Sequence, residues 1–339
     1  MQARATIDGC QYANWSEAIF RQMRQGAVDA IVATVSYHED FRETVANIIA
    51  WNRNIERHHD LLMRGRTFAD VDAARSSGRT AIFLGLQNPL PIGDDIGLIE
   101  ILHDLGIRFM QLSYNNQSLL AAGCYEPNDS GITRMGREVI AEMNRVGLVI
   151  DMSHSAERST LEAIELSRRP IAITHANPAR WHPAARNKSD AVLRALAERG
   201  GMIGLSLYPH HLKGGSLCRL DDFTGMVADL VSLVGVAHIG IGSDLCQDQP
   251  DSVIAWMRNG RWTKGATDLG LGKPVLPPQP AWFRDNRDFG TLRGGLLARG
   301  FSAADAAAIL GGNWYRFFAE SFGPMPPPSR GSGLTMSGQ

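Results

Sequence analysis

The segment at residues 148–177, LVIDMSHSAERSTLEAIELSRRPIAITHAN, holds the pattern that decides the fold. Two short apolar runs, at 148–153 and 171–174, flank a stretch with helical periodicity at 156–168. Parallel strands buried on both faces are continuous apolar runs, and consecutive parallel strands need a crossover connection, usually a helix. We therefore predict a strand–helix–strand unit here.

The same alternation recurs on both sides of this unit. Further strand candidates lie at 3–8, 27–36, 80–87, 107–114, 201–208 and 238–244, and further helix candidates lie at 39–63, 96–105, 134–146, 188–199, 221–235 and 302–319. Strands that alternate with helices over this length predict an α/β fold, a closed (β/α)8 TIM barrel, in preference to an open doubly wound sheet. Nucleotide binding loses support because the turn after the first strand has one glycine and no phosphate-binding loop motif occurs.

We predict that residues 1–323 form a single barrel domain. The segment 246–292 after the last strand candidate contains Trp256, Trp262, Trp282 and the piece LGKPVLPPQP, and it is too long for an ordinary connection. We expect this insertion to overhang the active face as a lid or substrate wall, with a structural flap or a dimer contact as alternatives. The tail 324–339 is rich in Pro, Gly and Ser and is expected to be disordered.

The composition excludes several classes of protein. Hydrophobic residues make up 44% and charged residues 20% of the chain, which is typical of a globular protein. A formal net charge of -1 gives no general attraction for nucleic acid or an anionic membrane, so a small-molecule partner is expected. The four cysteines lack metal or redox spacing, and no run approaches the ~20 apolar residues of a membrane span. These features, with no signal-peptide pattern at the N-terminus, predict a cytoplasmic protein.

Polar residues follow the predicted strands. In (β/α)8 barrels the reactive groups sit at the carboxyl ends of the strands, so these residues are the first candidates for a site. In chain order they are Cys10, Tyr37, His38, Gln87, Asn88, Tyr114, Asn115, His154, His175, Tyr208, His210 and Asp244.

His154 and His175 end consecutive strands, which lie about 5 Å apart in a sheet. Their imidazoles can therefore converge on one ion, and Asp244, at the end of the last predicted strand, projects into the same end of the barrel. Two imidazoles and a carboxylate suit zinc or another divalent ion. The alternative is that each histidine merely bonds to a neighbouring loop.

Other candidates carry weaker signals. Arg186 follows the sixth strand and is positioned either to bind a substrate carboxylate or to lie solvated at the surface. Helix candidates or loops contain the remaining histidines, which we expect at the surface or the rim: His58, His59, His103, His182, His210 and His211. Cys124 and Cys246 are interpreted as buried thiols.

Several motifs in this order resemble the membrane (renal) dipeptidase family, peptidase family M19, over about residues 4–320. They are IDMSH at 150–154, ITHAN at 173–177, ARNKSD at 185–190 and HIGIGSD at 238–244, with GITRMGREVIAEMNRVG at 131–147 and ILGGNWYRFF at 309–318. The resemblance implies an amidohydrolase-like TIM barrel, often a homodimer, whose metal centre hydrolyses dipeptides.

By the same resemblance, individual positions acquire roles. His154 and His175 match the two histidines that bind the family's second zinc. Asp244 matches the catalytic aspartate that shuttles a proton to the leaving amine. Arg186 matches the arginine that holds the substrate's terminal carboxylate.

The sequence departs from the family at the other half of the centre. Family members carry a His-x-Asp pair where this chain has Cys10-Gln11-Tyr12, and a bridging glutamate and a substrate-binding histidine correspond to Gln87 and Tyr114. Two divalent cations about 3.5 Å apart need carboxylates to offset their repulsion. We therefore predict at most one divalent ion, zinc, on His154 and His175, aided by Gln87 or Asp244, with Cys10 as a candidate thiolate ligand.

These observations favour a divergent bacterial member that hydrolyses a C–N bond in a small amide or dipeptide. In this hypothesis Asp244 transfers the proton, while Arg186 and Tyr114 orient the substrate. Two alternatives stay open: a lyase or isomerase acting on a small amine-bearing acid, and a non-catalytic binding protein that has lost its metals.

Overall fold

The computed structural model describes residues 5–261 and 275–323, and within them the strands form one parallel sheet. The strands are β1 (Ile7–Gln11), β2 (Ala30–Ser36), β3 (Leu62–Arg64), β4 (Thr80–Leu86), β5 (Ile107–Gln111), β6 (Val149–Asp151), β7 (Ala172–Ala176), β8 (Met202–Leu205) and β9 (Ile239–Ile241). Because β1 pairs with both β2 and β9, and β2 pairs with β4, eight of these strands close into a barrel. The predicted (β/α)8 barrel is confirmed.

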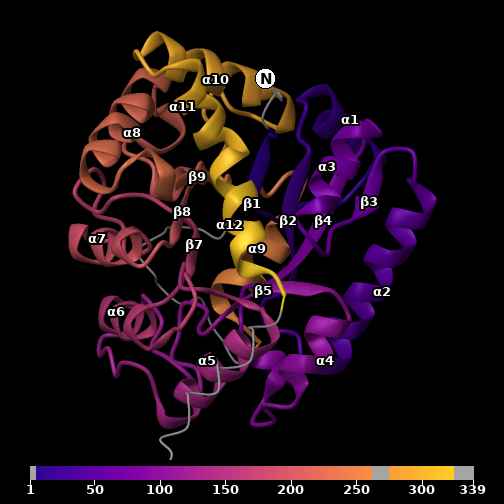
Figure 1. Cartoon of the computed structure of the whole chain (residues 1–339), viewed down its shortest axis with the longest axis vertical. Coiled ribbons are helices and arrows are strands. Elements are labelled where there is room, and N and C mark those ends of the chain that lie inside the picture. The colour runs from indigo at the N-terminus through magenta and orange to yellow at the C-terminus, as the bar shows by residue number, and fades with distance from the viewer. Residues whose placement is uncertain (1–4, 262–274, 324–339) are drawn as a thin grey trace, which may run out of the picture.

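Helices surround the barrel, as Figure 1 shows. They are α1 (Glu17–Gln25), α2 (Phe41–Arg57), α3 (Ala69–Ser76), α4 (Leu98–Asp104), α5 (Arg134–Val146), α6 (Glu157–Leu166), α7 (Asp190–Glu198), α8 (Leu220–Val234), α9 (Asp251–Asn259), α10 (Phe289–Ala298), α11 (Ala303–Ala307) and α12 (Asn313–Ser321). Local signals set their ends. For α5, the Thr133 hydroxyl caps the first turn, and Gly147 ends the helix with φ 84°, a conformation that favours glycine.

The prediction of one helix over 39–63 was wrong at its end. Helix α2 stops at Arg57, and β3 follows as a ninth strand that the sequence did not reveal. Strand β3 pairs with the start of β4, whereas β5 pairs with its later residues. The short strand therefore covers the part of β4 that β5 does not reach.

Other boundaries also differ from the prediction, and the strands predicted to end at 114, 208 and 244 end at Gln111, Leu205 and Ile241. The first strand begins at Ile7 rather than at residue 3, and residues 1–4 lie outside the described residues. The predicted helix at 302–319 divides into α11, a π-helical stretch and α12, with an irregular backbone at Gly311. Helices α1, α3, α9 and α10 were not predicted.

Helix α12 closes the amino end of the barrel. Its side chains Trp314, Phe317 and Phe318 are fully buried, and they pack in one cluster with Ile7 and Met202, which lie at the starts of their strands. The Trp314 indole donates a hydrogen bond to the Ile241 carbonyl oxygen at 2.9 Å. With the amino end filled in this way, the carboxyl end is left for a site.

Within the described residues, none of the helices combines the length and the apolar character needed to cross a membrane.

Candidate active site

Side chains from the carboxyl ends of the barrel strands line one cavity. Its lining comprises Gln87, Tyr114, Asn115, Tyr125, His154, Arg186, Tyr208, His211, Asp244, Cys246, Ile254, Met257 and Arg258. Seven residues were given a catalytic, substrate-binding or metal-binding role from the sequence, and five of these are in the lining: Gln87, Tyr114, His154, Arg186 and Asp244. The other two, Cys10 and His175, contact members of this set. The structure thus brings together the seven residues that were given a role.

His154 and His175 face each other through their Nε2 atoms, which lie 3.1 Å apart. The Nδ1 atom of His154 lies 2.7 Å from the Asn115 side-chain oxygen. A carbonyl oxygen only accepts hydrogen bonds, so Nδ1 carries the proton and Nε2 of the neutral ring keeps a free lone pair. Burial, and then the positive charge of Arg186, hold the pKa of both imidazoles well below the ordinary value. Neutral imidazole is the form that binds metals.

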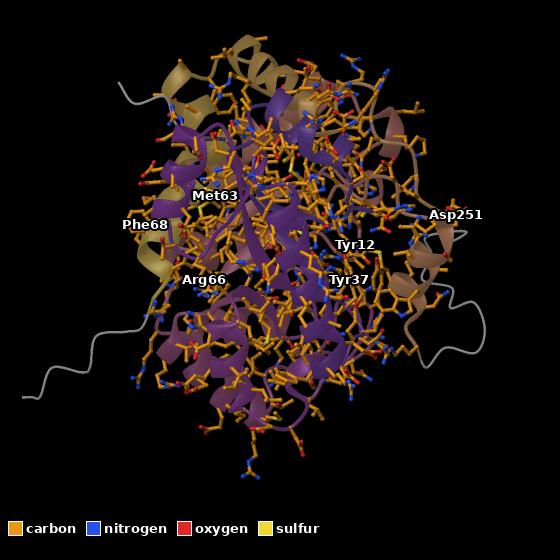
Figure 2. All side chains as sticks on the ribbon, turned by 90° about the vertical axis from the view of Figure 1, so that its right-hand side faces the viewer. Tyr12, Tyr37, Met63, Arg66, Phe68 and Asp251 are labelled. Atoms are coloured by element: carbon orange, nitrogen blue, oxygen red, sulfur yellow. The ribbon has the colours of Figure 1, made fainter. Side chains whose placement is uncertain are left out.

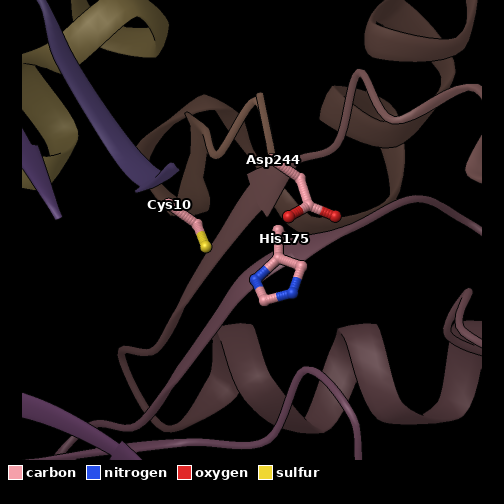
Figure 3. A group of neighbouring side chains, drawn as sticks. All are labelled: Cys10, His175 and Asp244. Atoms are coloured by element: carbon pink, nitrogen blue, oxygen red, sulfur yellow. The ribbon is translucent and has the colours of Figure 1, made fainter. Parts of the chain in front are cut away.

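Cys10, His175 and Asp244 form a second, overlapping group. Their ligand atoms all lie within 4.8 Å of one another, and all three residues are buried. Figure 3 shows the Cys10 sulfur and the Asp244 carboxylate directed toward the His175 ring from two different strand ends. His175 therefore belongs to both groups and is the residue on which the site centres.

Gln87 joins Cys10 to the neighbouring strand β2. Its Nε2 atom lies 2.8 Å from the Thr34 hydroxyl, 3.2 Å from the Tyr37 hydroxyl and 3.3 Å from the Cys10 sulfur. The amide nitrogen donates, which leaves the Gln87 carbonyl oxygen with no hydrogen-bond partner in the described parts of the chain. The side chain that corresponds to the family's bridging glutamate is thus a neutral amide, held by the groups around it.

Asp244 is placed to handle a proton. Burial raises the pKa of its carboxyl to about 7, and the nearby Asp8 and Asp151 add to this effect while Arg186 opposes it. Across residues 5–261 and 275–323, no side chain or backbone group hydrogen-bonds to this carboxylate. Its backbone has φ 57°, and its N–H donates to the Cys10 carbonyl oxygen at 2.9 Å. The backbone is thus fixed while the carboxylate stays available to a substrate.

Arg186 is 2% exposed, which excludes the solvated alternative. Its guanidinium donates hydrogen bonds to the carbonyl oxygens of Ser153 and His175. The positive charge therefore lies directly beside the two histidines. The Tyr114 ring packs against the His154 ring with 4.2 Å between their centroids.

Helix α9, part of the 246–292 segment, forms one wall of the cavity. Its residues Ile254, Met257 and Arg258 line the cavity, and Arg258 donates a hydrogen bond to the Tyr208 hydroxyl at 2.8 Å. Figure 2 shows Asp251, the first residue of α9, on the same side of the barrel as Tyr12 and Tyr37. Trp262 and the first part of the Pro-rich piece, residues 271–274, lie outside the described residues.

Several functional positions were missed by sequence reasoning. Asn115 fixes the His154 ring, although the sequence marked it only as a polar residue near a strand end. His211, expected at the rim, is buried in the cavity wall, and its Nδ1 lies 2.8 Å from the Ser206 hydroxyl. The pairing of His211 with Ser206 depends on a short 3-10 turn, for which the sequence has no clear signal.

The buried His211 ring should make a pH-dependent contribution to the free energy of unfolding of the metal-free protein. Burial, aided by Arg186, lowers its pKa well below 6.5, so the folded state favours the neutral ring. This contribution is present above pH 6.5 and is lost as the pH falls below that value. The difference in free energy of unfolding between wild type and His211→Asn should therefore shrink as the pH falls from about 7.5 to about 5.5. Urea denaturation of both proteins at the two pH values measures this difference. A difference that stays constant between the two pH values would contradict the prediction.

Comparisons with known proteins agree with this architecture. The model of the membrane dipeptidase family (peptidase family M19) matches residues 5–256. Dipeptidase aclJ of Aspergillus oryzae is 26% identical over 289 residues, which are 84% of this chain and 62% of that protein. Dipeptidase verJ of Clonostachys rogersoniana is 30% identical over 234 residues, which are 68% of this chain and 59% of that protein. The chain thus spans less than two thirds of the length of these relatives.

Solved structures extend the likeness to nearly the whole chain. An amidohydrolase from Pseudomonas aeruginosa is 34% identical and has a TM-score of 0.89, with 94% of this chain and 97% of that chain covered. Dipeptidase AC, a metallopeptidase of family M19, shares the fold at 18% identity with a TM-score of 0.78, covering 95% of this chain and 100% of that chain. Together with the family match over residues 5–256, these findings show that this chain belongs to the membrane dipeptidase family, peptidase family M19.

Proposed function

We propose that this protein is a metal-dependent hydrolase that cleaves the C–N bond of a small amide or dipeptide at a single zinc ion. The observation that carries the proposal is the pair of neutral imidazoles whose Nε2 atoms lie 3.1 Å apart, beside the free carboxylate of Asp244. The dipeptidases among its relatives support the same reaction class.

The residues present fit a zinc ion. Two nitrogen ligands of one tetrahedral zinc, each about 2.0–2.1 Å from the metal, lie about 3.3 Å apart, close to the observed separation of the histidine nitrogens. We propose His154 and His175 as ligands, with the Cys10 sulfur and the Gln87 carbonyl oxygen as further donors. When bound, the ion would act as a Lewis acid on the scissile carbonyl and lower the pKa of a water molecule.

The protein's own groups supply the remaining chemistry. With its carboxylate unengaged, Asp244 is suited to take a proton from water and to return it to the leaving amine. Arg186 brings a buried positive charge beside the histidines, which favours a substrate that carries a carboxylate. Tyr114 and α9 enclose the substrate from two sides, so we propose the 246–292 segment as a substrate wall.

A metal stoichiometry of one ion per chain is the first expected result. Gln87 and Tyr12 are neutral where a second cation would need carboxylates, so the charge of a second cation would be uncompensated. Elemental analysis after zinc reconstitution and removal of excess metal measures the number. Two equivalents per chain would contradict the single-ion proposal, and the absence of any bound metal would favour a binding protein.

A direct assay tests the activity. We expect zinc-reconstituted protein to hydrolyse at least one member of a panel of dipeptides and small amides, with loss of turnover on chelation and recovery on adding zinc back. Oxygen from labelled water should enter the carboxylate product, which separates hydrolysis from an isomerase or lyase step. No turnover of any panel member by protein that holds zinc would overturn the proposal.

We also propose a cytoplasmic location and a homodimer. All four cysteines, Cys10, Cys124, Cys218 and Cys246, are free thiols, which fits a reducing compartment. The dimer rests on the resemblance to the family alone. The proposals of one domain over 1–323 and of a disordered tail stay predictions, and the tail 324–339 lies outside the described residues.

A further inference from the structure

We infer that Asp151 and Thr174 are positioning residues that fix the His175 ring so that its Nε2 atom faces the metal. The inference rests on the proposed metal centre. It concerns residues that do not line the cavity, and it gives a role to a buried carboxylate that reaches the proposed ligand His175 through Thr174.

Asp151 accepts hydrogen bonds at both of its oxygens. Oδ1 accepts from the Ser153 N–H at 3.0 Å, the Ser153 hydroxyl at 2.5 Å and the Thr174 N–H at 3.0 Å. Oδ2 accepts from the Thr174 hydroxyl at 2.5 Å. Asp151 ends β6 and Thr174 lies in β7, so this carboxylate ties together the two strands that carry the proposed histidine ligands.

The Thr174 hydroxyl then determines which His175 nitrogen carries the proton. Its single hydrogen points to Asp151, so its oxygen can only accept from His175 Nδ1, which lies 2.8 Å away. Nδ1 therefore holds the ring hydrogen, and Nε2 keeps a lone pair.

As a result, two unprotonated Nε2 atoms, those of His154 and His175, face each other. His154 Nε2 also lacks a hydrogen, because its Nδ1 donates to Asn115. The lone pairs of two nitrogen atoms 3.1 Å apart repel each other, whereas a cation bound by both nitrogens is attracted to each lone pair. The hydrogen bonds of Asp151 and Thr174 on one ring, and of Asn115 on the other, thus prepare both rings as ligands for one metal, as outer hydrogen bonds do in many metal sites.

Burial makes this a positioning role rather than a catalytic one. Asp151 is 3% exposed, Thr174 is 2% exposed and His175 is fully buried. The Ser153 hydroxyl also accepts from the His175 N–H at 3.2 Å, so the same network holds the backbone of the ligand. Changes in Thr174 should therefore act on metal affinity and ring orientation.

The test compares Thr174→Val with Thr174→Ser and with Thr160→Val. Thr160 is a matched control because it is also buried, on α6, and its hydroxyl donates to the Ala156 carbonyl oxygen, its one hydrogen-bond partner among the described residues. Thr174→Val should bind zinc about 10- to 100-fold more weakly in a chelator competition. Thr174→Ser, which keeps the hydroxyl, and Thr160→Val should bind zinc as wild type does.

A second readout is independent of metal and of activity. Nitrogen-15 NMR of the metal-free wild type should show His175 protonated at Nδ1, and the Nδ1 hydrogen should exchange with water faster in Thr174→Val. Unchanged zinc affinity in a folded Thr174→Val variant would overturn the inference, and so would a His175 ring protonated at Nε2 in the wild type. If the wild type bound no zinc, the proposed function would fail. The NMR experiment would still decide the inference, because it reports which nitrogen of His175 is protonated in the metal-free protein. If Thr174→Val did not fold, the wild-type NMR result would decide it.

Discussion

An Asp244→Asn variant is expected to lose about 10²- to 10⁴-fold in kcat/KM on whichever dipeptide or amide the wild type hydrolyses. The amide keeps the size and shape of the side chain but can no longer accept the proton that water must give up. Because asparagine tolerates a positive φ as aspartate does, the backbone at φ 57° should be retained. Steady-state kinetics on zinc-loaded protein, with zinc content measured in parallel, tests the prediction.

Asp248→Asn is the matched control for this experiment. Asp248 has the same positive φ of 57° and lies in the same connection after β9, but it is exposed and does not line the cavity. It should keep wild-type kinetics. An Asp244→Asn enzyme with wild-type kcat/KM would remove Asp244 from the reaction. Loss of zinc together with activity would make Asp244 a ligand instead, since its carboxylate lies within 4.8 Å of the ligand atoms of Cys10 and His175.

The sequence predicted the barrel well because parallel strands buried on both faces leave a direct trace as continuous apolar runs. It also predicted most of the residues placed in the candidate site, because a polar residue that ends a barrel strand must lie at the carboxyl end of the barrel. The failures occurred where a distant contact decides local structure. The apolar pattern of α2 continues into Leu61 and Leu62, and only pairing with Thr80 on β4 makes this end a strand.

The hydrogen bonds within the site could not be predicted from the sequence, because they too join residues that are far apart in the chain. Cys10 and Gln87 are far apart in the chain, and nothing in their spacing shows that the amide lies 3.3 Å from the sulfur. The proton positions on His154 and His175 depend on hydrogen-bond partners, Asn115 and Thr174, whose residue types are common in loops and strands. A motif identifies which side chains meet, whereas the hydrogen-bond network determines their protonation.

A His175→Ala variant is expected to lose the stabilisation that zinc gives the protein. In the wild type, free zinc at about 100 times its dissociation constant should raise the free energy of unfolding by about 2.7 kcal/mol, because the metal binds only the folded protein. His175 belongs to both the His154 pair and the Cys10–Asp244 group, so its removal takes a ligand from each of them. Thermal unfolding with and without zinc measures the effect.

His211→Ala separates the loss of a ligand from the loss of a buried ring. His211 lines the same cavity and is also buried, but its Nδ1 is engaged by the Ser206 hydroxyl, and it lies outside the group formed by Cys10, His175 and Asp244. Both variants should be less stable than wild type without metal, because each leaves a cavity and removes a buried hydrogen bond. Only His211→Ala should recover stability when zinc is added. An equal zinc response in the two variants would place the metal away from His175 and would require a different ligand set for the reaction.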